Sequence, residues 1–166
     1  MTKQYFIELA DFNVWANDIV HSWLNAITDE QWEKPIVSSF NSIRETVLHV
    51  IGAEIIWLER LKNVSAPVWL PQVFKGSKEE LIENWKKASA DLKVFVENFD
   101  DNGLDQPMIF KRLNGEENRM PHYQVFAHVF NHSTYHRGQL VTMLRQAGYT
   151  DVRSTDMLMY FREKNN

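Results

Sequence analysis

Cysteine is absent from the 166 residues of this chain. Its absence excludes a disulfide framework and any zinc site built on thiolates. It also means that a thiol taking part in a reaction must come from outside the protein. Glycine and proline are scarce, with six and five residues, which favours long uninterrupted elements over many short strands. No run of residues approaches the ~20 apolar positions that a membrane-spanning helix needs.

Positive charge is in short supply as well. The chain has 18 Lys and Arg residues against 22 Asp and Glu residues, which leaves a net charge of -4. Because phosphate binding depends on clustered Lys and Arg, we expect no nucleic-acid partner. The first residues, MTKQYFIELADFNVW, lack the apolar core and the small-residue cleavage site of a signal peptide. We therefore expect a cytoplasmic protein with no membrane partner.

Apolar residues, at 44% of the chain, are abundant enough for a substantial core. The chain is most simply a single domain over residues 1–166. Its first long helical pattern places apolar residues at steps of three and four, and therefore on one face. These residues are Tyr5, Leu9, Phe12, Ala16, Ile19 and Trp23. His21 lies off this stripe, and we expect it to be exposed to solvent.

Two capping patterns mark the starts of the next long helices. Ser42 is followed three residues later by Glu45, and helical periodicity then continues to about Leu61. The same serine and glutamate spacing recurs at residues 77–80, at the start of a third helix that reaches roughly Phe99. Both patterns predict helices that begin at the serine.

The connections between these helices differ in character. Residues 28–32 predict a short turn of helix, whereas residues 63–76 contain two prolines and a glycine and predict a loop. Within residues 100–121, the dipeptide Asn114-Gly115 lies between two short runs, which is the strongest local signal for a tight hairpin turn. We expect a small hairpin or an ordered loop there.

The last long helix has a signal at each end. Pro121 suits the first turn of a helix that runs to Ala147 and stops at Gly148. A short C-terminal helix follows, with Ser154 or Thr155 as its cap. Four long helices joined by connections of modest length predict an all-α fold, a four-helix bundle with a small hairpin or loop before the last long helix.

Three histidines recur at intervals of four in HVFNHSTYHRGQL, which runs from His128 to Leu140. Since an α-helix advances about 100° per residue, each position can be placed on a helical wheel. His132 and His136 fall within the apolar stripe, and His128 falls at its edge. The stripe consists of Val125, Val129, Leu140, Met143 and Ala147. His128 and His136 are about 12 Å apart along the axis, so all three cannot easily bind one ion.

His49 is the best candidate for a third ligand to a metal held by His132 and His136. It lies in the middle of the second helix, in VLHVIGAEII, where an unpaired polar residue is costly. Facing helices of a bundle build metal sites from such inward side chains. The alternative is that each ring is a hydrogen-bonded core histidine without a metal. For His128, packing or support of a ligand is the favoured role.

Four stretches of the chain together resemble the DinB-like metalloprotein family. The segment at residues 128–140 resembles the family's signature in the last helix, and FNVWAN at residues 12–17 resembles its first-helix motif. Residues 38–61 resemble its second helix with the first histidine, and STDMLMYFRE at residues 154–163 resembles its C-terminal segment. The similarity spans essentially the whole chain.

This resemblance implies a four-helix bundle that is often a homodimer. It also implies a divalent metal, usually zinc or nickel, held by three histidines, which match His49, His132 and His136 here. Relatives of this kind include thiol S-transferases that use low-molecular-weight thiols, and a thiol-dependent isomerase. The resemblance thus implies a small-molecule substrate.

Two classes of function remain open on the sequence. The first is a metal-dependent enzyme, either a transferase that activates a low-molecular-weight thiol or a hydrolase that activates water; Glu45 and Tyr135 are candidates for its acid or base, or are structural. The second is a non-enzymatic metal-binding bundle with a structural, sensing or stress-response role. A coordination position that opens on a pocket would favour the enzyme, because structural sites are usually closed by a fourth protein ligand.

Overall fold

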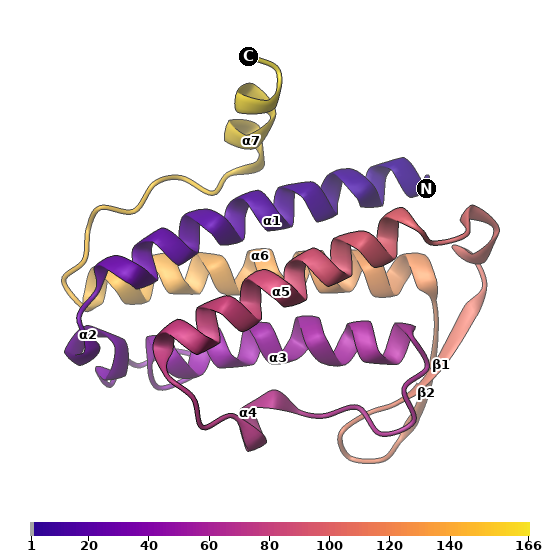
Figure 1. The fold of residues 1–166 in the computed structure, drawn as a ribbon, viewed down its shortest axis with the longest axis horizontal. Helices are drawn as coiled ribbons and strands as arrows, with labels where there is room; N and C mark the ends of the chain where they lie inside the picture. The colour runs from indigo at the N-terminus through magenta and orange to yellow at the C-terminus, as the bar shows by residue number, and fades with distance from the viewer. Residues whose placement is uncertain (1) are drawn as a thin grey trace.

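The computed structural model describes residues 2–166, which form seven α-helices, one short 3-10 turn and one two-stranded sheet (Figure 1). The long helices are α1 (Lys3–Ala26), α3 (Ile43–Leu61), α5 (Lys78–Glu97) and α6 (His122–Gln146). The short elements are α2 (Asp29–Glu33), α4 (Leu70–Val73), the 3-10 turn Asp101–Gly103, β1 (Pro107–Lys111), β2 (Glu117–Pro121) and α7 (Met157–Lys164). No helix in this part of the chain combines the length and the apolar character needed to cross a membrane.

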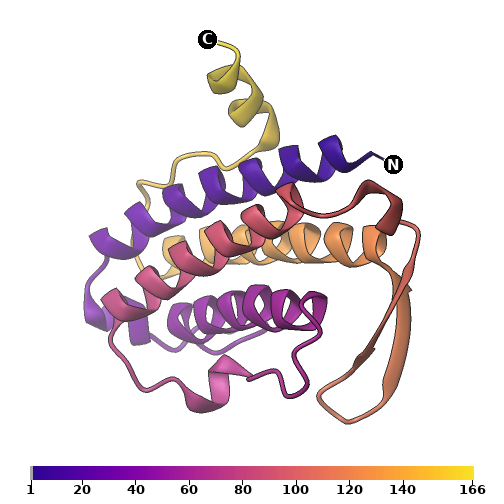
Figure 2. The same ribbon diagram turned by 45° about the vertical axis from the view of Figure 1, so that its right-hand side comes forward.

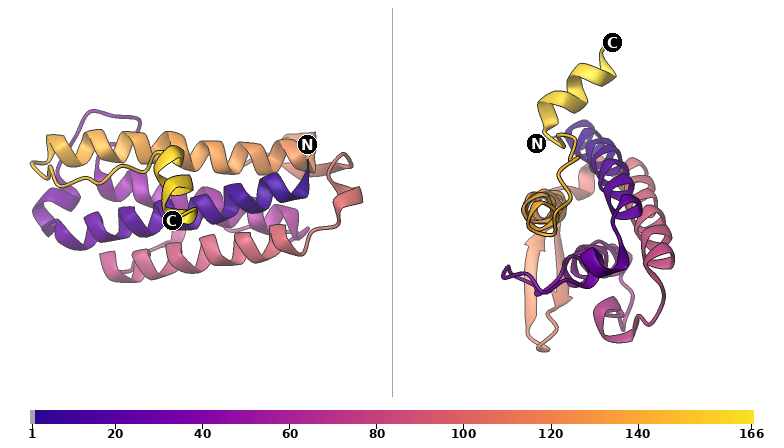
Figure 3. Two further views of the ribbon diagram at one scale, coloured as in Figure 1. Left: turned by 90° about the horizontal axis from the view of Figure 1, so that it is seen from above. Right: turned by 90° about the vertical axis from the view of Figure 1, so that its left-hand side faces the viewer.

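The four long helices lie side by side, as the end-on view in Figure 3 shows. Helix α1 contacts α5 and α6, and α3 contacts the same two helices, so each long helix has two long neighbours. The hairpin β1–β2 extends away from the start of α6, and α7 projects beyond α1 (Figure 2). The architecture is therefore mostly helical with a small antiparallel sheet at one end.

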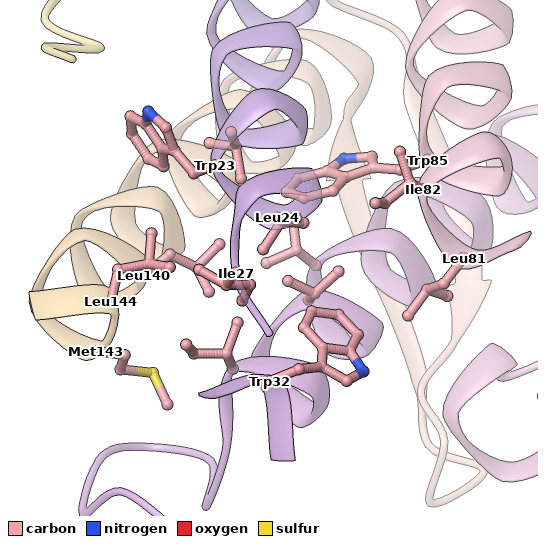
Figure 4. Close-up of a cluster of buried hydrophobic side chains, with 14 of the residues drawn as sticks. Trp23, Leu24, Ile27, Trp32, Leu81, Ile82, Trp85, Leu140, Met143 and Leu144 are labelled. Carbon is pink, nitrogen blue, oxygen red and sulfur yellow. The ribbon is translucent and has the colours of Figure 1, made fainter. Parts of the chain in front are cut away.

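Two clusters of buried side chains fill the space between the long helices. Figure 4 shows the first, in which Trp23 of α1 and Trp85 of α5 pack with Leu140 of α6. The second, at the other end, includes Phe6 of α1 and Phe126 of α6, whose ring centroids are 5.4 Å apart. Each fully buried side chain of this size contributes about 1.5–3 kcal/mol, so the two clusters hold the helices in register.

The capping residues begin α3 and α5 as the sequence predicts. The Ser42 hydroxyl accepts a hydrogen bond from the Glu45 N–H at 3.1 Å, but the Glu45 carboxylate accepts from the Asn41 N–H rather than from the Ser42 N–H. In α5 the box is complete, with Ser77 and Glu80 each accepting from the other's backbone N–H. Both helix starts are confirmed, and α2 begins with a similar box in the predicted turn near residues 28–32.

The predicted hairpin is present, with a longer turn than the Asn-Gly pair indicates. The Gly115 N–H donates to the Arg112 carbonyl at 2.9 Å, and the Arg112 N–H donates to the Glu116 carbonyl at 2.8 Å. Gly115 has φ +87°, which glycine adopts without a steric penalty. Three residues therefore lie between Arg112 and Glu116, as in a type I turn followed by a left-handed glycine.

Three local predictions need correction. Residues 63–76 are not all loop, since α4 lies within them. A Cβ at Gly52 of α3 would be 2.7 Å from Pro71 Cδ, so the glycine permits the close approach of α4 to α3. Pro121 ends β2 and occupies the N-cap position of α6, one residue before its first turn, without a side-chain capping hydrogen bond. Helix α7 is capped by Asp156, whose side chain accepts a hydrogen bond from the Leu158 N–H. The predicted caps, Ser154 and Thr155, do not cap it.

The prediction that His21 is exposed is wrong. Its relative accessibility is 3%, and its ring lies edge-on to Trp85 with centroids 5.1 Å apart. Neither ring nitrogen has a hydrogen-bond partner, and Asp18 Oδ1 lies 3.5 Å from Nδ1. The buried face of α1 is wider than its apolar stripe because α1 is covered by both α5 and α6. Burial lowers the pKa of His21 to about 4, with smaller effects from Asp18, Lys86 and Glu83.

This histidine should make the protein sensitive to acid. The unfolded ring takes up a proton near its ordinary pKa of 6.5, whereas the folded ring stays neutral down to about 4. The stability that depends on neutral His21 is therefore complete above pH 6.5 and is lost as the pH falls toward 4, by up to about 3 kcal/mol. Denaturant unfolding of H21L and the parent protein at pH 7.5 and 4.5, both in EDTA, would measure this.

Because all other histidines are present in both proteins, their contributions cancel in the difference. We expect H21L to gain stability relative to the parent protein as the pH falls. If the free energies of unfolding of H21L and the parent protein differ by the same amount at both pH values, the prediction is wrong.

Candidate metal centre

Three imidazoles converge between α3 and α6. The Nε2 atom of His132 lies 3.0 Å from Nε2 of His49 and 3.1 Å from Nε2 of His136. One ring nitrogen from each residue lies within 4.8 Å of the others. Nitrogens bound to one tetrahedral zinc at ~2.1 Å are roughly 3.4 Å apart. The group could therefore hold a metal ion.

Two features of the fold bring these rings together. His132 and His136 are four residues apart on α6, so both point from the same face of the helix. Helix α3 packs along α6 and presents His49 to that face. His136 is buried, and the other two rings are partly buried. The structure thus unites all three residues that the helical wheel and the apolar run of α3 singled out.

The rings are held in the neutral form that metals bind. Burial, and then the charge of His136, lowers the pKa of His49 to about 4. Burial and the three neighbouring histidines lower the pKa of His132 to about 3. Burial also lowers the pKa of His136, whereas the hydrogen bond to Gln139 raises it by a smaller amount. At neutral pH the lone pairs on nitrogen are available to a cation.

Gln139 orients His136 from behind. Nδ1 of His136 lies 2.7 Å from the Gln139 side-chain oxygen, so with Nε2 in the cluster the ring donates from Nδ1. The Gln139 amide in turn donates to Ser39 Oγ at 2.7 Å and to the Tyr135 hydroxyl at 3.1 Å. Such outer partners fix the tautomer and orientation of a ligating histidine.

The other candidate residues do not join the three nitrogens. The Glu45 carboxylate caps the start of α3, and the Tyr135 hydroxyl accepts from Gln139. The His128 ring packs against Trp57 and His132, with centroids 5.2 and 5.7 Å away. The position of His128 at the edge of the apolar stripe of α6 favours packing beside a ligand as its role.

An open cavity of about 680 Å³ adjoins the histidines. His49 and His132 line one part of it, and the aromatic rings of Trp57, Trp69 and Phe110 line much of the rest. Phe40 closes another side of the cluster, with its ring centroid 4.3 Å from that of His49. A molecule in this cavity would reach the histidine cluster across a largely apolar surface.

A buried polar network includes residues that follow the histidines on α3 and α6, and sequence reasoning missed it. Glu54 of α3 is fully buried and accepts four hydrogen bonds. The donors are Asn13 Nδ2 at 2.9 Å, Asn17 Nδ2 at 3.1 Å, Ser89 Oγ at 2.7 Å and Ser133 Oγ at 3.1 Å. One carboxylate thus joins all four long helices.

Arg137 completes this network. Its guanidinium donates to the side-chain oxygens of Asn13 at 2.6 Å and Asn17 at 2.9 Å, so the two asparagines lie between Arg137 and Glu54. Arg137 and Ser133 directly follow the candidate ligands on α6. The i, i+4 asparagines in FNVWAN, and a glutamate inside an apolar run, were the available signals.

Comparison with known proteins places the chain in a family. The model of the DinB family matches residues 1–165. The chain belongs to the DinB family. Among curated DinB-family relatives, Protein DinB of Bacillus subtilis (strain 168) is 28% identical over 169 residues, covering 98% of this chain and 97% of the relative. The uncharacterized protein YrdA of the same organism is 25% identical over 150 residues, covering 90% and 85%.

Solved DinB-like structures share the fold. A DinB-like protein from Bacillus cereus ATCC 10987 superposes with a TM-score of 0.71 at 19% identity, covering 92% of this chain and 97% of that one. A DinB-like protein from Bacillus subtilis gives 0.67 at 14% identity, covering 89% and 96%. At these identities the similarity concerns the DinB fold alone.

Proposed function

We propose that this DinB-family protein is a metal-dependent enzyme that activates a low-molecular-weight thiol or water, with thiol S-transfer as its leading activity. The observation that carries the proposal is the open cavity beside His49 and His132. Within residues 2–166, the cluster contains three histidines and no further His, Cys, Asp or Glu. Structural zinc sites are normally closed by a fourth protein ligand, whereas catalytic sites leave one position for water or substrate.

The chemistry follows from the donor set. A divalent ion held by three neutral imidazoles keeps its full positive charge, and it lowers the pKa of a bound water or thiol. His49, His132 and His136 would hold that ion, and Gln139 would keep the His136 ring in place. The apolar side chains of the cavity wall would contact the apolar part of a substrate.

The finer assignments form part of the same proposal. Three imidazoles suit zinc or nickel, and we propose one of these as the resident metal. We propose that the packed long helices form the four-helix bundle of the family and that the protein is a homodimer. The competing function is a non-enzymatic one, in which the metal serves stability, sensing or a stress response.

A cobalt-substituted protein would test the thiol chemistry. Adding millimolar 2-mercaptoethanol or cysteine should change the visible spectrum, because sulfur enters the coordination shell, and the bound thiol should have a lowered pKa. The H49A variant, treated identically, is the control for cobalt in free solution. A spectrum of the parent protein that does not change at millimolar thiol would overturn the transferase proposal.

A further inference from the structure

Arg60 lies in the wall of the cavity and has no acidic partner. The residue is in the last turn of α3, and its guanidinium carbon lies 4.7 Å from the centre of the Trp57 ring and 5.3 Å from that of Phe110. Its side chain makes one hydrogen bond, from Nη2 to the Lys111 carbonyl at 2.9 Å, and within residues 2–166 no carboxylate pairs with it. Burial lowers the pKa of Arg60, which reflects the cost of leaving this charge unpaired.

The charge of the cavity has the opposite sign to that of the protein. The chain carries a net charge of -4, yet the cavity lining contains Arg60 and Arg112 and, among the described residues, no Asp or Glu. Arg112 is paired with Glu116 at 3.3 Å, so Arg60 is the cation of the lining that has no carboxylate partner within residues 2–166. The nearby His128 has its pKa lowered by burial and then by the charge of Arg60. A cleft lined by one sign of charge with apolar walls concentrates ligands of the other sign.

The cavity is also elongated. His49 and Arg60 are eleven residues apart on the same helix, which corresponds to roughly 16 Å along its axis. Between them lie the indole of Trp57 and the apolar side chains of Ala53 and Ile56. The cationic end and the histidine end are therefore joined by an apolar surface.

We propose that this cavity selects elongated small molecules that carry a carboxylate, which Arg60 binds while an apolar body lies on Trp57 and Phe110. The inference rests on the proposed function in one respect: the other end of the substrate then lies at the three histidines. Arg60 thereby acts as a specificity-determining residue. The carboxylate belongs to the thiol or to the molecule that the thiol attacks.

A pair of matched ligands tests this without relying on a reaction. The probes are 4-phenylbutyrate and its neutral analogue 4-phenylbutanamide, with binding followed by quenching of tryptophan fluorescence. We expect the acid to bind the protein at least ~10-fold more tightly than the amide, since a charge-assisted pair exceeds a neutral hydrogen bond. R60Q should remove most of this preference by weakening the binding of the acid more than that of the amide.

R119Q is the matched control, because Arg119 lies on β2 of the neighbouring hairpin and does not line the cavity. It removes an equal charge and should leave the preference intact. R60M retains an unbranched side chain over Trp57 and repeats the test if R60Q folds poorly. Equal affinities with and without EDTA would exclude binding of the carboxylate to a metal.

Equal affinity for acid and amide, no binding of the acid at millimolar concentration, or an equal loss in R119Q would each overturn the proposal. Failure of the cobalt and thiol experiment would leave this assay unaffected, because it requires neither metal nor thiol. Mercaptoalkanoic acids of increasing length would then show whether the carboxylate comes from the thiol. If it does, these acids should bind the cobalt form of the parent protein more tightly than 2-mercaptoethanol does. In the cobalt form of R60Q, their affinity should fall to that of 2-mercaptoethanol.

Discussion

Replacing His49 by alanine should abolish stoichiometric binding of a divalent metal. The two imidazoles left on α6 are too few for a stable site, since catalytic zinc takes three protein ligands. His49 comes from a different helix, so its loss also removes the link between α3 and α6 that a shared ion would provide. Elemental analysis and zinc titration of protein without a histidine tag would measure the loss.

H128A is the control for this experiment. His128 packs on His132 without reaching the three nitrogens, so its removal should weaken metal binding by at most ~10- to 100-fold, as for residues that support a ligand. Retention of a full equivalent of metal by H49A, together with its loss in H128A, would show that the ligands are assigned wrongly.

Replacing Arg137 by methionine should destabilise the protein by about 3–5 kcal/mol, because one charge of a buried network is then left without its partner. Arg137 is 1% exposed, and two asparagines connect it to the fully buried Glu54. Burial lowers the pKa of Arg137 and the charge of Glu54 opposes this, so the guanidinium is charged at neutral pH. Denaturant unfolding would measure the change.

R145M provides the comparison on the same helix. Arg145 is exposed in the last turn of α6, so its replacement should cost less than about 1 kcal/mol, mostly through the helix dipole. The double variant E54L/R137M should lose less than the sum of the single losses, since apolar groups can replace a buried pair at small cost. A loss in R137M no larger than that in R145M would show that the network contributes little to stability.

The network also bears on metal binding. Ser133 and Arg137 follow His132 and His136 on α6, and Glu54 lies five residues beyond His49 on α3. Hydrogen bonds from the other three long helices to the Glu54 carboxylate therefore set the position of α3 against α6. This explains how ligands on two separate helices can meet within hydrogen-bonding distance.

The sequence by itself determined the features that depend on near neighbours along the chain. Helix periodicity placed His132 and His136 on one face of α6, and the cost of an isolated polar residue in an apolar run drew attention to His49. The starts of α3 and α5 and the stop at Gly148 could also be predicted, because caps are local hydrogen bonds. These rules require no knowledge of what a helix packs against.

Only the tertiary structure decided which polar residues became buried and paired. His21 is buried because α5 and α6 together cover more of α1 than its apolar stripe. Glu54 is buried because the three other long helices supply its hydrogen-bond donors. Arg60 reaches the histidine cavity only because the hairpin folds back beside α3. Each outcome depends on contacts between residues distant in sequence, and the periodicity of a single helix carries no information about those contacts.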